Sequence, residues 1–221
     1  WLRGGHLLVE SEIDGVVRRD SDVAADGRTM PSLAEYAAHL LGDASGHRIS
    51  NSAVWQSSQR CIVIHATNGV KVNNNVCHDI AGHAYFLEDA VERRNLIEGN
   101  LALMIRSPAA AKALKAHELP VFQAGASGFW LTNPDNTVRG NLAGDAQGNG
   151  FWLAFPRKPT GPSAGVAMLP DRLPFGVFDD NVAHSNGQPG INLDWAPPDD
   201  AGNVGPNKPA PPPDGSENRY A

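Results

Sequence analysis

The sequence predicts an all-β fold, a right-handed parallel β-helix of about 5–6 coils with two loop insertions and a Pro-rich tail. The first observation is a repeat, because Gly128–Leu131 (Gly-Phe-Trp-Leu) returns unchanged as Gly150–Leu153, 22 residues later. A second pattern has an apolar residue, two polar or small residues, Asn, an apolar residue and a small residue. It occurs at Val72–Cys77, Ile97–Ala102, Val138–Ala143 and Phe178–Ala183. A period of 20–50 residues indicates a solenoid, because one unit cannot bury its own apolar face and must stack on copies of itself.

Each unit also carries short runs of β-branched and aromatic residues, which are strand signals when Gly, Asn and Asp flank them. Successive units begin at Ile49, Val72 and Ile97, so the first two are 23 and 25 residues long. Two or three short strands with tight turns fill a unit of that length. The run that follows the Asn pattern appears as Cys61–Ile64, Ala84–Leu87, Phe129–Leu131, Phe151–Leu153 and Ile191–Leu193.

The recurring Asn predicts a structural column rather than a catalytic one. Asn falls at the same place in four units, and Ser takes its place in the unit before them. Stacked side-chain amides hydrogen-bond from coil to coil, and Asn tolerates the left-handed turn conformation. The column consists of Ser52, Asn75, Asn100, Asn141 and Asn181.

The repeats predict three regions. Residues 1–32 read as an incomplete N-terminal coil or connection, 33–195 as the β-helix domain and 196–221 as a Pro-rich tail or linker. Ser32–Leu41 is expected to form a strand, because the repeat requires one there, although its composition suits a short helix equally well. Gly4–Val9 could be the last strand of an earlier coil.

Two insertions interrupt the coils near the end of the second run, so they could wall a groove on that side. The first spans about Arg106–Gly128 and includes a predicted short helix at Ala109–His117. The second, Pro156–Pro174, is rich in Pro and Gly and is predicted to be a loop. Long loops in compact domains are usually functional or disordered.

Composition narrows the classes of partner. The formal net charge is -6 and the pI is about 5.7, so no basic footprint for nucleic acid is present. No apolar run approaches the ~20 residues that span a bilayer. The chain begins at Trp1 without Met, so we expect it to be part of a longer chain. Cys61 and Cys77 are predicted to be buried small residues and not a disulfide, and their spacing matches no metal motif.

Strand alternation predicts which side chains leave the core. One outward column reads Ala37, Val63, Phe86, Trp130, Trp152 and Asn192, which is an aromatic strip if it faces solvent. The neighbouring column contains His39, His65 and Glu88, with Asp89 and His83 nearby. At roughly 4.8 Å between coils, the two histidines and the carboxylate could hold a metal or exchange a proton. The alternative for the tryptophans is burial under an insertion loop, because tryptophan is rarely left open to water.

Six blocks in order carry a resemblance. They are His39–Ala44, Ser57–His65, Gly82–Asp89, Trp130–Asn136, Pro159–Gly161 and Asn181–Asn186. Together they resemble the β-helix region of the hyaluronan-depolymerising family, which includes the animal cell-migration-inducing and cell-surface hyaluronidases and uncharacterised bacterial secreted relatives. The resemblance covers about residues 33–195.

The resemblance implies an extracellular or cell-surface protein that acts on a uronic-acid-containing polysaccharide, with a divalent metal (calcium or zinc) as a candidate cofactor. From the residues and the resemblance together, we expect three groups of site residues. The catalytic candidates are His65, Glu88, Asp89 and His83; the substrate-binding candidates are Trp130, Trp152, Asn133, Phe86 and His184; and the metal candidates are His39, His65 and Glu88.

One departure from the family pattern bears on activity. The family's Tyr-Pro-Ile-His-x-His block reads Ala34–His39 here, so Ala37 replaces the first His. Three functions therefore stay open. The first is a glycan depolymerase, with hydrolysis favoured over a lyase reaction. The second is a non-catalytic glycan-binding module, and the third is a structural solenoid of a larger surface protein.

Overall fold

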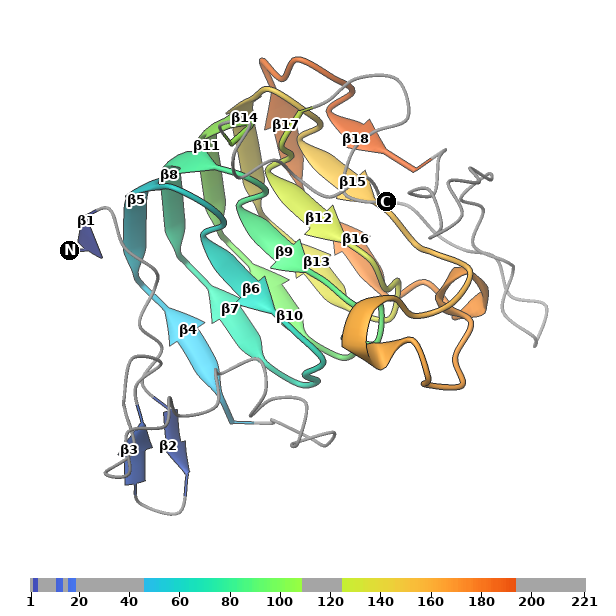
Figure 1. The fold of residues 1–221 in the computed structure, drawn as a ribbon. Helices are drawn as coiled ribbons and strands as arrows, with labels where there is room; N and C mark the ends of the chain where they lie inside the picture. Colours follow the sequence, from blue (N-terminus) through green and yellow to red (C-terminus); the bar gives the residue numbers. More distant parts are fainter. Residues whose placement is uncertain (1, 4–10, 14–15, 19–45, 109–124, 194–221) are drawn as a thin grey trace.

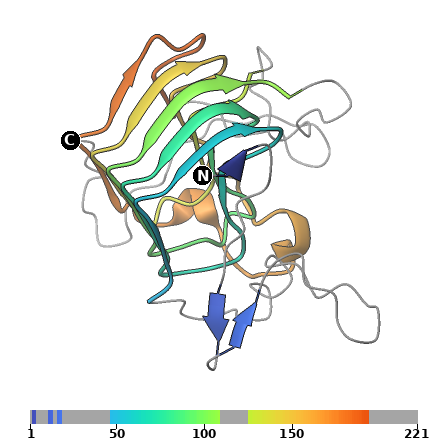
Figure 2. The ribbon, with the colours of Figure 1, turned by 90° about the vertical axis from the view of Figure 1, so that its left-hand side faces the viewer.

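The computed structural model of the chain describes residues 2–3, 11–13, 16–18, 46–108 and 125–193 (Figure 1). The described chain forms three parallel sheets, and the predicted parallel β-helix is confirmed. Each coil contributes one strand to each sheet, so strands of successive coils lie side by side in chain order (Figure 2). Ala37, His39, the predicted strand at Ser32–Leu41, the predicted helix at Ala109–His117 and the Pro-rich tail fall outside the described residues.

The strands of the three sheets are short. The first sheet contains β4 (Arg48–Ser50), β7 (Lys71–Asn73), β10 (Leu96–Glu98), β13 (Thr137–Arg139) and β16 (Val177–Asp179). The second contains β1 (Leu2–Arg3), β5 (Ala53–Ser57), β8 (Val76–Ala81), β11 (Leu101–Arg106), β14 (Leu142–Ala146) and β17 (Val182–His184). The third contains β6 (Ile62–Ile64), β9 (Tyr85–Leu87), β12 (Phe129–Leu131), β15 (Phe151–Leu153) and β18 (Ile191–Asn192). Strands β2 (Ser11–Ile13) and β3 (Val16–Arg18) pair separately as an antiparallel hairpin.

The Asn column forms the predicted ladder at the corner between the first and second sheets. Asn75 Nδ2 donates to Asn100 Oδ1 (3.0 Å), Asn100 to Asn141 (3.0 Å) and Asn141 to Asn181 (2.9 Å). The same oxygens accept main-chain N–H groups, so the buried amides are satisfied in both directions. The left-handed conformation belongs to the preceding residue of each coil and not to the Asn itself. Those residues are Asn51, Asn74, Gly99, Gly140 and Asp180.

Stacked aromatic rings fill the core between the sheets. The ring centroids of Tyr85 and Phe129 lie 4.5 Å apart, as do those of Phe129 and Phe151. These residues occupy one register position of the third sheet, so identical positions in successive coils place similar rings above one another. The Tyr85 hydroxyl lies 3.0 Å from the main-chain oxygen of Asn75 and 3.2 Å from that of Leu101, so its proton has an acceptor inside an apolar core.

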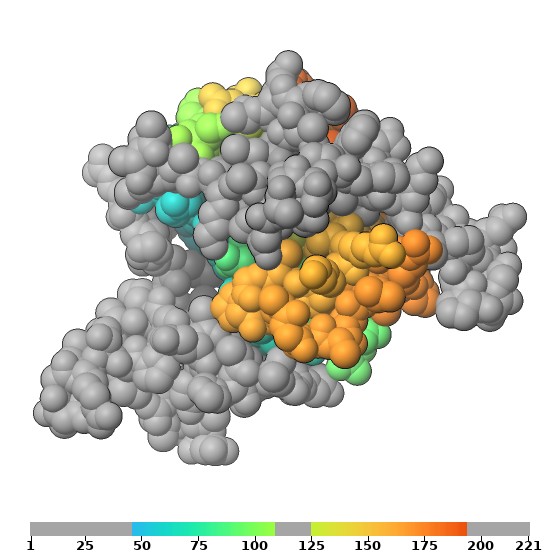
Figure 3. All heavy atoms as spheres, turned by 45° about the vertical axis from the view of Figure 1, so that its right-hand side comes forward, coloured from blue at the N-terminus to red at the C-terminus, as the bar shows by residue number. Residues whose placement is uncertain are grey.

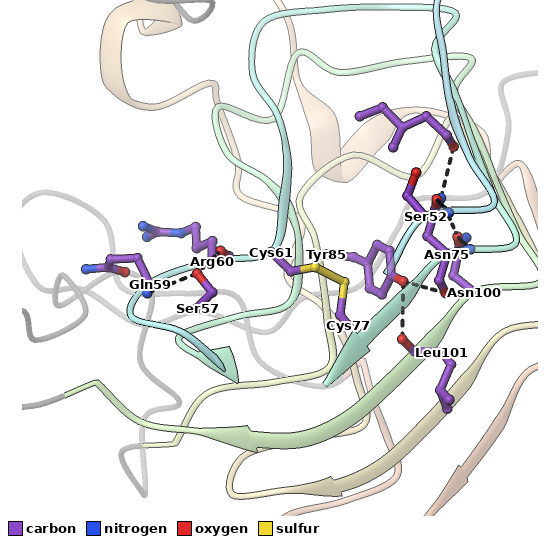
Figure 4. Close-up of a disulfide and its surroundings, with 11 residues drawn as sticks. Ser52, Ser57, Gln59, Arg60, Cys61, Asn75, Cys77, Tyr85, Asn100 and Leu101 are labelled. Atoms are coloured by element: carbon purple, nitrogen blue, oxygen red, sulfur yellow. Dashed lines mark hydrogen bonds between the residues drawn. A yellow bond between two sulfur atoms is a disulfide. The ribbon is translucent and has the colours of Figure 1, made fainter. Parts of the chain in front are cut away.

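Cys61 and Cys77 form a disulfide, so the prediction of two free thiols was wrong (Figure 4). The prediction placed the two residues on different strands of neighbouring coils, at positions that do not stack on each other, and therefore kept them apart. Both side chains point into the core, where the second and third sheets face each other, and their Cα atoms lie 6.0 Å apart. That separation lies within the range that a disulfide spans. The bond therefore ties the start of β6 to β8 across the interior.

The second insertion forms the predicted loop between β15 and β16. It contains two 3-10 turns, η3 (Gly161–Ser163) and η4 (Pro170–Arg172). Residues of this loop, in orange, lie at the surface of the face shown in Figure 3. We call residues 156–174 the insertion loop. The described residues include no helix long and apolar enough to cross a membrane.

Candidate functional site

His65, Glu88 and Asp89 come together at the ends of β6 and β9. These strands are paired neighbours, and Ile64 is in register with Leu87, so the residues that follow them meet. The Nδ1 atom of His65 lies 3.1 Å from Glu88 Oε2, and its Nε2 atom lies 3.4 Å from Asp89 Oδ2. The imidazole thus lies between two carboxylates. The contact between His65 and Glu88 was predicted from their stacked positions in successive coils.

The three side chains differ in their access to solvent. The side chain of Glu88 is 23% exposed, that of His65 13% and that of Asp89 1%. A substrate could therefore reach Glu88 and one edge of His65, whereas Asp89 contacts the imidazole from inside the protein. This resembles an exposed acid/base pair with a buried orienting carboxylate.

The carboxylates raise the pKa of His65. The hydrogen bond with Glu88 is the largest cause, partial burial acts in the opposite direction, and the charges of Asp89, Glu88 and Glu92 add to the increase. A neighbouring carboxylate stabilises the imidazolium, which desolvation alone would disfavour. His65 therefore keeps its proton to a higher pH than a free histidine.

A third acidic residue, Glu92, lies behind the cluster and was not among the predicted site residues. Its Oε1 atom accepts the main-chain N–H groups of Ala66 (2.9 Å) and Asp89 (3.0 Å). Glu92 is fully buried, and burial raises its pKa to about 7. One carboxyl group thus joins the turn after His65 to the residue after Glu88. A carboxylate four residues beyond Glu88 in a non-helical segment gave no periodic signal in the sequence.

The insertion loop covers Asp89, and the predicted groove beside it stays a prediction. Ser163 Oγ donates to Asp89 Oδ2 at 2.7 Å, and the Thr160 N–H donates to the Asp89 main-chain oxygen at 3.1 Å. Gly161 lies directly against the other carboxylate oxygen, Oδ1. The sequence pointed to Pro159–Gly161 as a block but not to Ser163, because a loop residue has no register.

The donor atoms of His65, Glu88 and Asp89 fit a divalent cation in type and spacing. One ligand atom from each lies within 4.8 Å of the others, and the charge of the group is negative when the imidazole is neutral. Imidazole with carboxylates suits zinc or manganese, and carboxylates suit calcium. His65 and Glu88 are thus placed together as predicted, Asp89 is added to them, and His39 lies outside the described residues.

The aromatic strip keeps its predicted register but not its predicted exposure. Phe86, Trp130 and Trp152 are paired neighbours of the third sheet, yet each is 1% exposed or less. With Ala154 they form a second buried cluster on the side of the sheet that faces away from the main core. The alternative of burial was therefore correct, and these ring faces are not open to a sugar in this arrangement.

The three remaining predicted residues of the described chain bind groups other than the imidazole. The ring of His83 is fully buried against Trp130, and its Nδ1 atom accepts the Ser127 N–H at 2.9 Å. Asn133 is buried and donates to the Ala90 main-chain oxygen, so it supports the turn after Asp89. His184 is exposed on β17 of the second sheet and shares no contact with the cluster in the described structure.

The fold and the cluster define a parallel β-helix with a histidine–carboxylate site at the edge of one sheet. The sequence profile of the CEMIP beta-helix family matches residues 2–191, so the chain belongs to that family. The chain is 29% identical to the human cell surface hyaluronidase CEMIP2 over 216 aligned residues, which cover 86% of this chain and 16% of that protein. It is 36% identical to mouse fibrocystin-L over 154 residues, covering 69% of this chain and 3% of that protein.

A third relative is the G8 domain-containing protein DDB_G0288475 of Dictyostelium discoideum. It is 33% identical over 198 residues, which cover 83% of this chain and 17% of the relative. The chain therefore spans less than a fifth of the length of each of these relatives. One of these relatives is named as a hyaluronidase, and the names of the other two state no enzyme activity.

Proposed function

We propose that this β-helix is the processing module of an extracellular or cell-surface protein that depolymerises a uronic-acid-containing polysaccharide, with hyaluronan-like chains as the substrate class. The observation that carries the proposal is the position of His65, partly exposed between the carboxylates of Glu88 and Asp89. Convergent titratable groups with perturbed pKa values are typical of catalytic sites. The hyaluronidase name of one relative, human CEMIP2, supplies the substrate class.

In this proposal Glu88 and His65 act on the substrate, and Asp89 positions the imidazole. Glu88 is the accessible carboxylate of the cluster, so it exchanges a proton with the glycosidic oxygen or with water. Asp89 is too deeply buried to meet a sugar, and it instead fixes the orientation and charge of His65. A hydrolase with two carboxyl groups across the bond would need a second exposed acid from outside the described residues.

A divalent cation fits the same site, held by His65, Glu88 and Asp89. When bound it would act as a Lewis acid and neutralise the uronate carboxylate. The charge of the cluster supports this assignment, because its two carboxylates would otherwise repel an anionic polymer. Metal binding requires a neutral imidazole, so protons compete for His65 below its raised pKa.

The disulfide supports the extracellular location. Disulfides persist in oxidising compartments and are rare in the cytosol. Cys61 and Cys77 are buried in the core and joined to each other. The hyaluronidase relative, human CEMIP2, is named as a cell surface protein, which points the same way.

A second candidate function is a glycan-binding or structural β-helix without catalysis. The match to fibrocystin-L, at 36% identity, exceeds the 29% to the hyaluronidase, and the fibrocystin-L name states no enzyme activity. The replacement of a family His by Ala37 also favours a protein without catalysis, and the burial of the tryptophans favours the structural form over the glycan-binding one. Kinship with bacterial secreted proteins stays a prediction, because the human, mouse and Dictyostelium discoideum relatives are eukaryotic.

The deciding experiment follows the size of hyaluronan, chondroitin and alginate by size-exclusion chromatography after incubation with the protein. Parallel samples contain calcium, zinc or a chelator, and ultraviolet absorbance is recorded throughout. Shorter chains without new absorbance indicate a hydrolase, and new absorbance indicates a lyase. We expect shortening that is lost on chelation.

The matched variants are Glu88→Gln and Glu98→Gln. Both remove one partly exposed carboxylate, but Glu98 lies on β10 and pairs with Arg139 away from the site. We expect Glu88→Gln to lower the rate at least 100-fold, the lower range for loss of a general acid or base, and Glu98→Gln to leave it unchanged. If no polymer shortens with any cation, the depolymerase is excluded. Co-sedimentation with the polymers then separates a binding module from a structural one.

A further inference from the structure

The insertion loop binds two polar atoms of Asp89, its main-chain oxygen and its Oδ2 atom. Ser163 binds its Oδ2 atom and Thr160 binds its carbonyl oxygen, although these residues lie more than 70 positions away in the sequence. Glu92 binds its N–H from the other side. The residue next to His65 is therefore fixed by a segment that is not part of any coil.

Gly161 adds a steric argument to these hydrogen bonds. A Cβ atom at Gly161 would lie 2.7 Å from Asp89 Oδ1, closer than real contacts allow, and the residue has a φ of +56°. Glycine is the residue that permits both the left-handed turn and this close approach. No described residue donates a hydrogen bond to Oδ1. The turn thus encloses the carboxylate while leaving one of its oxygens without a donor.

The geometry of Asp89 Oδ2 links the loop to the imidazole. This single oxygen lies 2.7 Å from Ser163 Oγ and 3.4 Å from His65 Nε2. Ser163 is itself buried, with 6% of the residue exposed, so water does not readily replace its hydroxyl. A carboxylate that rotates about its Cβ–Cγ bond would lose its alignment with Nε2 without this donor.

We propose that Ser163 is a positioning residue of the site: the 160–163 turn holds the Asp89 carboxylate toward His65 Nε2 and thereby sets the orientation of the imidazole. The catalytic consequence of this inference rests on the proposed function. The positioning itself concerns only the side chains of Ser163, Asp89 and His65. The insertion loop then both covers Asp89 and positions the imidazole of the site.

The test uses the full chain with Ser163→Ala, Gly161→Ala and the control Ser50→Ala. Ser50 Oγ also donates to a side-chain oxygen, that of Asn73 at 2.8 Å, but on the first sheet. The readout is the Nε2–H signal of His65 in NMR spectra, assigned with His65→Gln, because the chemical shift of an imidazole N–H responds to a carboxylate oxygen 3.4 Å away. Thermal unfolding of all variants reports the purely structural cost.

We expect the His65 Nε2–H resonance to move upfield or vanish by exchange in Ser163→Ala and in Gly161→Ala, and to stay in place in Ser50→Ala. Where depolymerisation is measured, kcat falls about tenfold at unchanged KM, since small misplacements of a catalytic group reduce the rate strongly. An unchanged His65 resonance in folded Ser163→Ala and Gly161→Ala overturns the inference. If no variant or parent shortens any polymer, the proposed function fails while the NMR result still decides this proposal.

Discussion

The carboxylate of Glu92 accepts the main-chain N–H of Asp89 at 3.0 Å, and the same oxygen accepts the N–H of Ala66 at 2.9 Å. The two donors belong to neighbouring coils, immediately after the residues that carry the candidate chemistry. Ala66 has a φ of +49°, so the chain turns sharply there and its N–H has no partner in a sheet ladder. A single buried side chain thus closes the end of the site.

Glu92→Gln and Glu92→Ala separate the hydrogen bonds of this residue from its charge. Gln keeps a carbonyl acceptor for both N–H groups, whereas Ala leaves two buried donors without a partner, at about 1–3 kcal/mol each. We expect the unfolding free energy to fall by about 3 kcal/mol in the Ala variant and by less than about 1 kcal/mol in the Gln variant. Denaturant titration at pH 6 measures both. Equal losses of unfolding free energy in the two variants would mean that the hydrogen bonds accepted by Glu92 do not account for its contribution to stability.

The stability of the protein is expected to decrease as the pH rises from about 5 to 8. The folded pKa of Glu92 is about 7, above its ordinary 4.5, and that of His65 is raised above 6.5. Over this window the folded state binds more protons than the unfolded state, so the unfolding free energy falls with pH. Thermal unfolding across the window should show the decline, and Glu92→Gln should flatten it. A rise in stability over the same pH range would contradict both assignments.

The amide ladder predicts a large effect of Asn100→Ala. Asn100 is 2% exposed, its Oδ1 atom accepts two hydrogen bonds from Asn75, and its Nδ2 group donates to Val72 and Asn141. Removal leaves buried groups unsatisfied in two neighbouring coils. We expect a loss of about 3 kcal/mol in the unfolding free energy, measured by urea titration.

The control for that prediction is Asn73→Ala, which removes a partly buried amide that accepts one hydrogen bond, from Ser50. Its expected cost is about 1 kcal/mol. Similar losses for the two Asn variants would show that the ladder contributes no more than an ordinary hydrogen bond.

The disulfide is expected to stabilise the first coils. The bond links residues 16 positions apart. A loop of that size contributes about 3 kcal/mol by restricting the unfolded chain. Thiol titration of the denatured, unreduced protein should detect no free thiol. The double variant Cys61→Ala with Cys77→Ala should lower the melting temperature under oxidising conditions, and a reductant should lower that of the parent but not of the variant.

The periodic part of the site was predictable from the sequence, and the non-periodic part was not. His65 and Glu88 lie 23 residues apart, one coil length, so counting alone places them beside each other. Glu92, Ser163 and Gly161 reach Asp89 through turns and a loop, where neither spacing nor alternation specifies position. The exposure of Trp130 was mispredicted for a related reason: alternation tells which side of a strand a residue faces, but not what packs on that side.

The sequence by itself determined the solenoid, the register of the third sheet and the amide ladder. Each of these repeats from coil to coil, and a repeating local pattern must stack on itself to bury its apolar face. The tertiary structure alone decided the Cys61–Cys77 bond, the enclosure of Asp89 and the burial of Trp130 and Trp152. These depend on distances across the core and on contacts made by an insertion, which are non-local quantities that one-dimensional spacing does not contain.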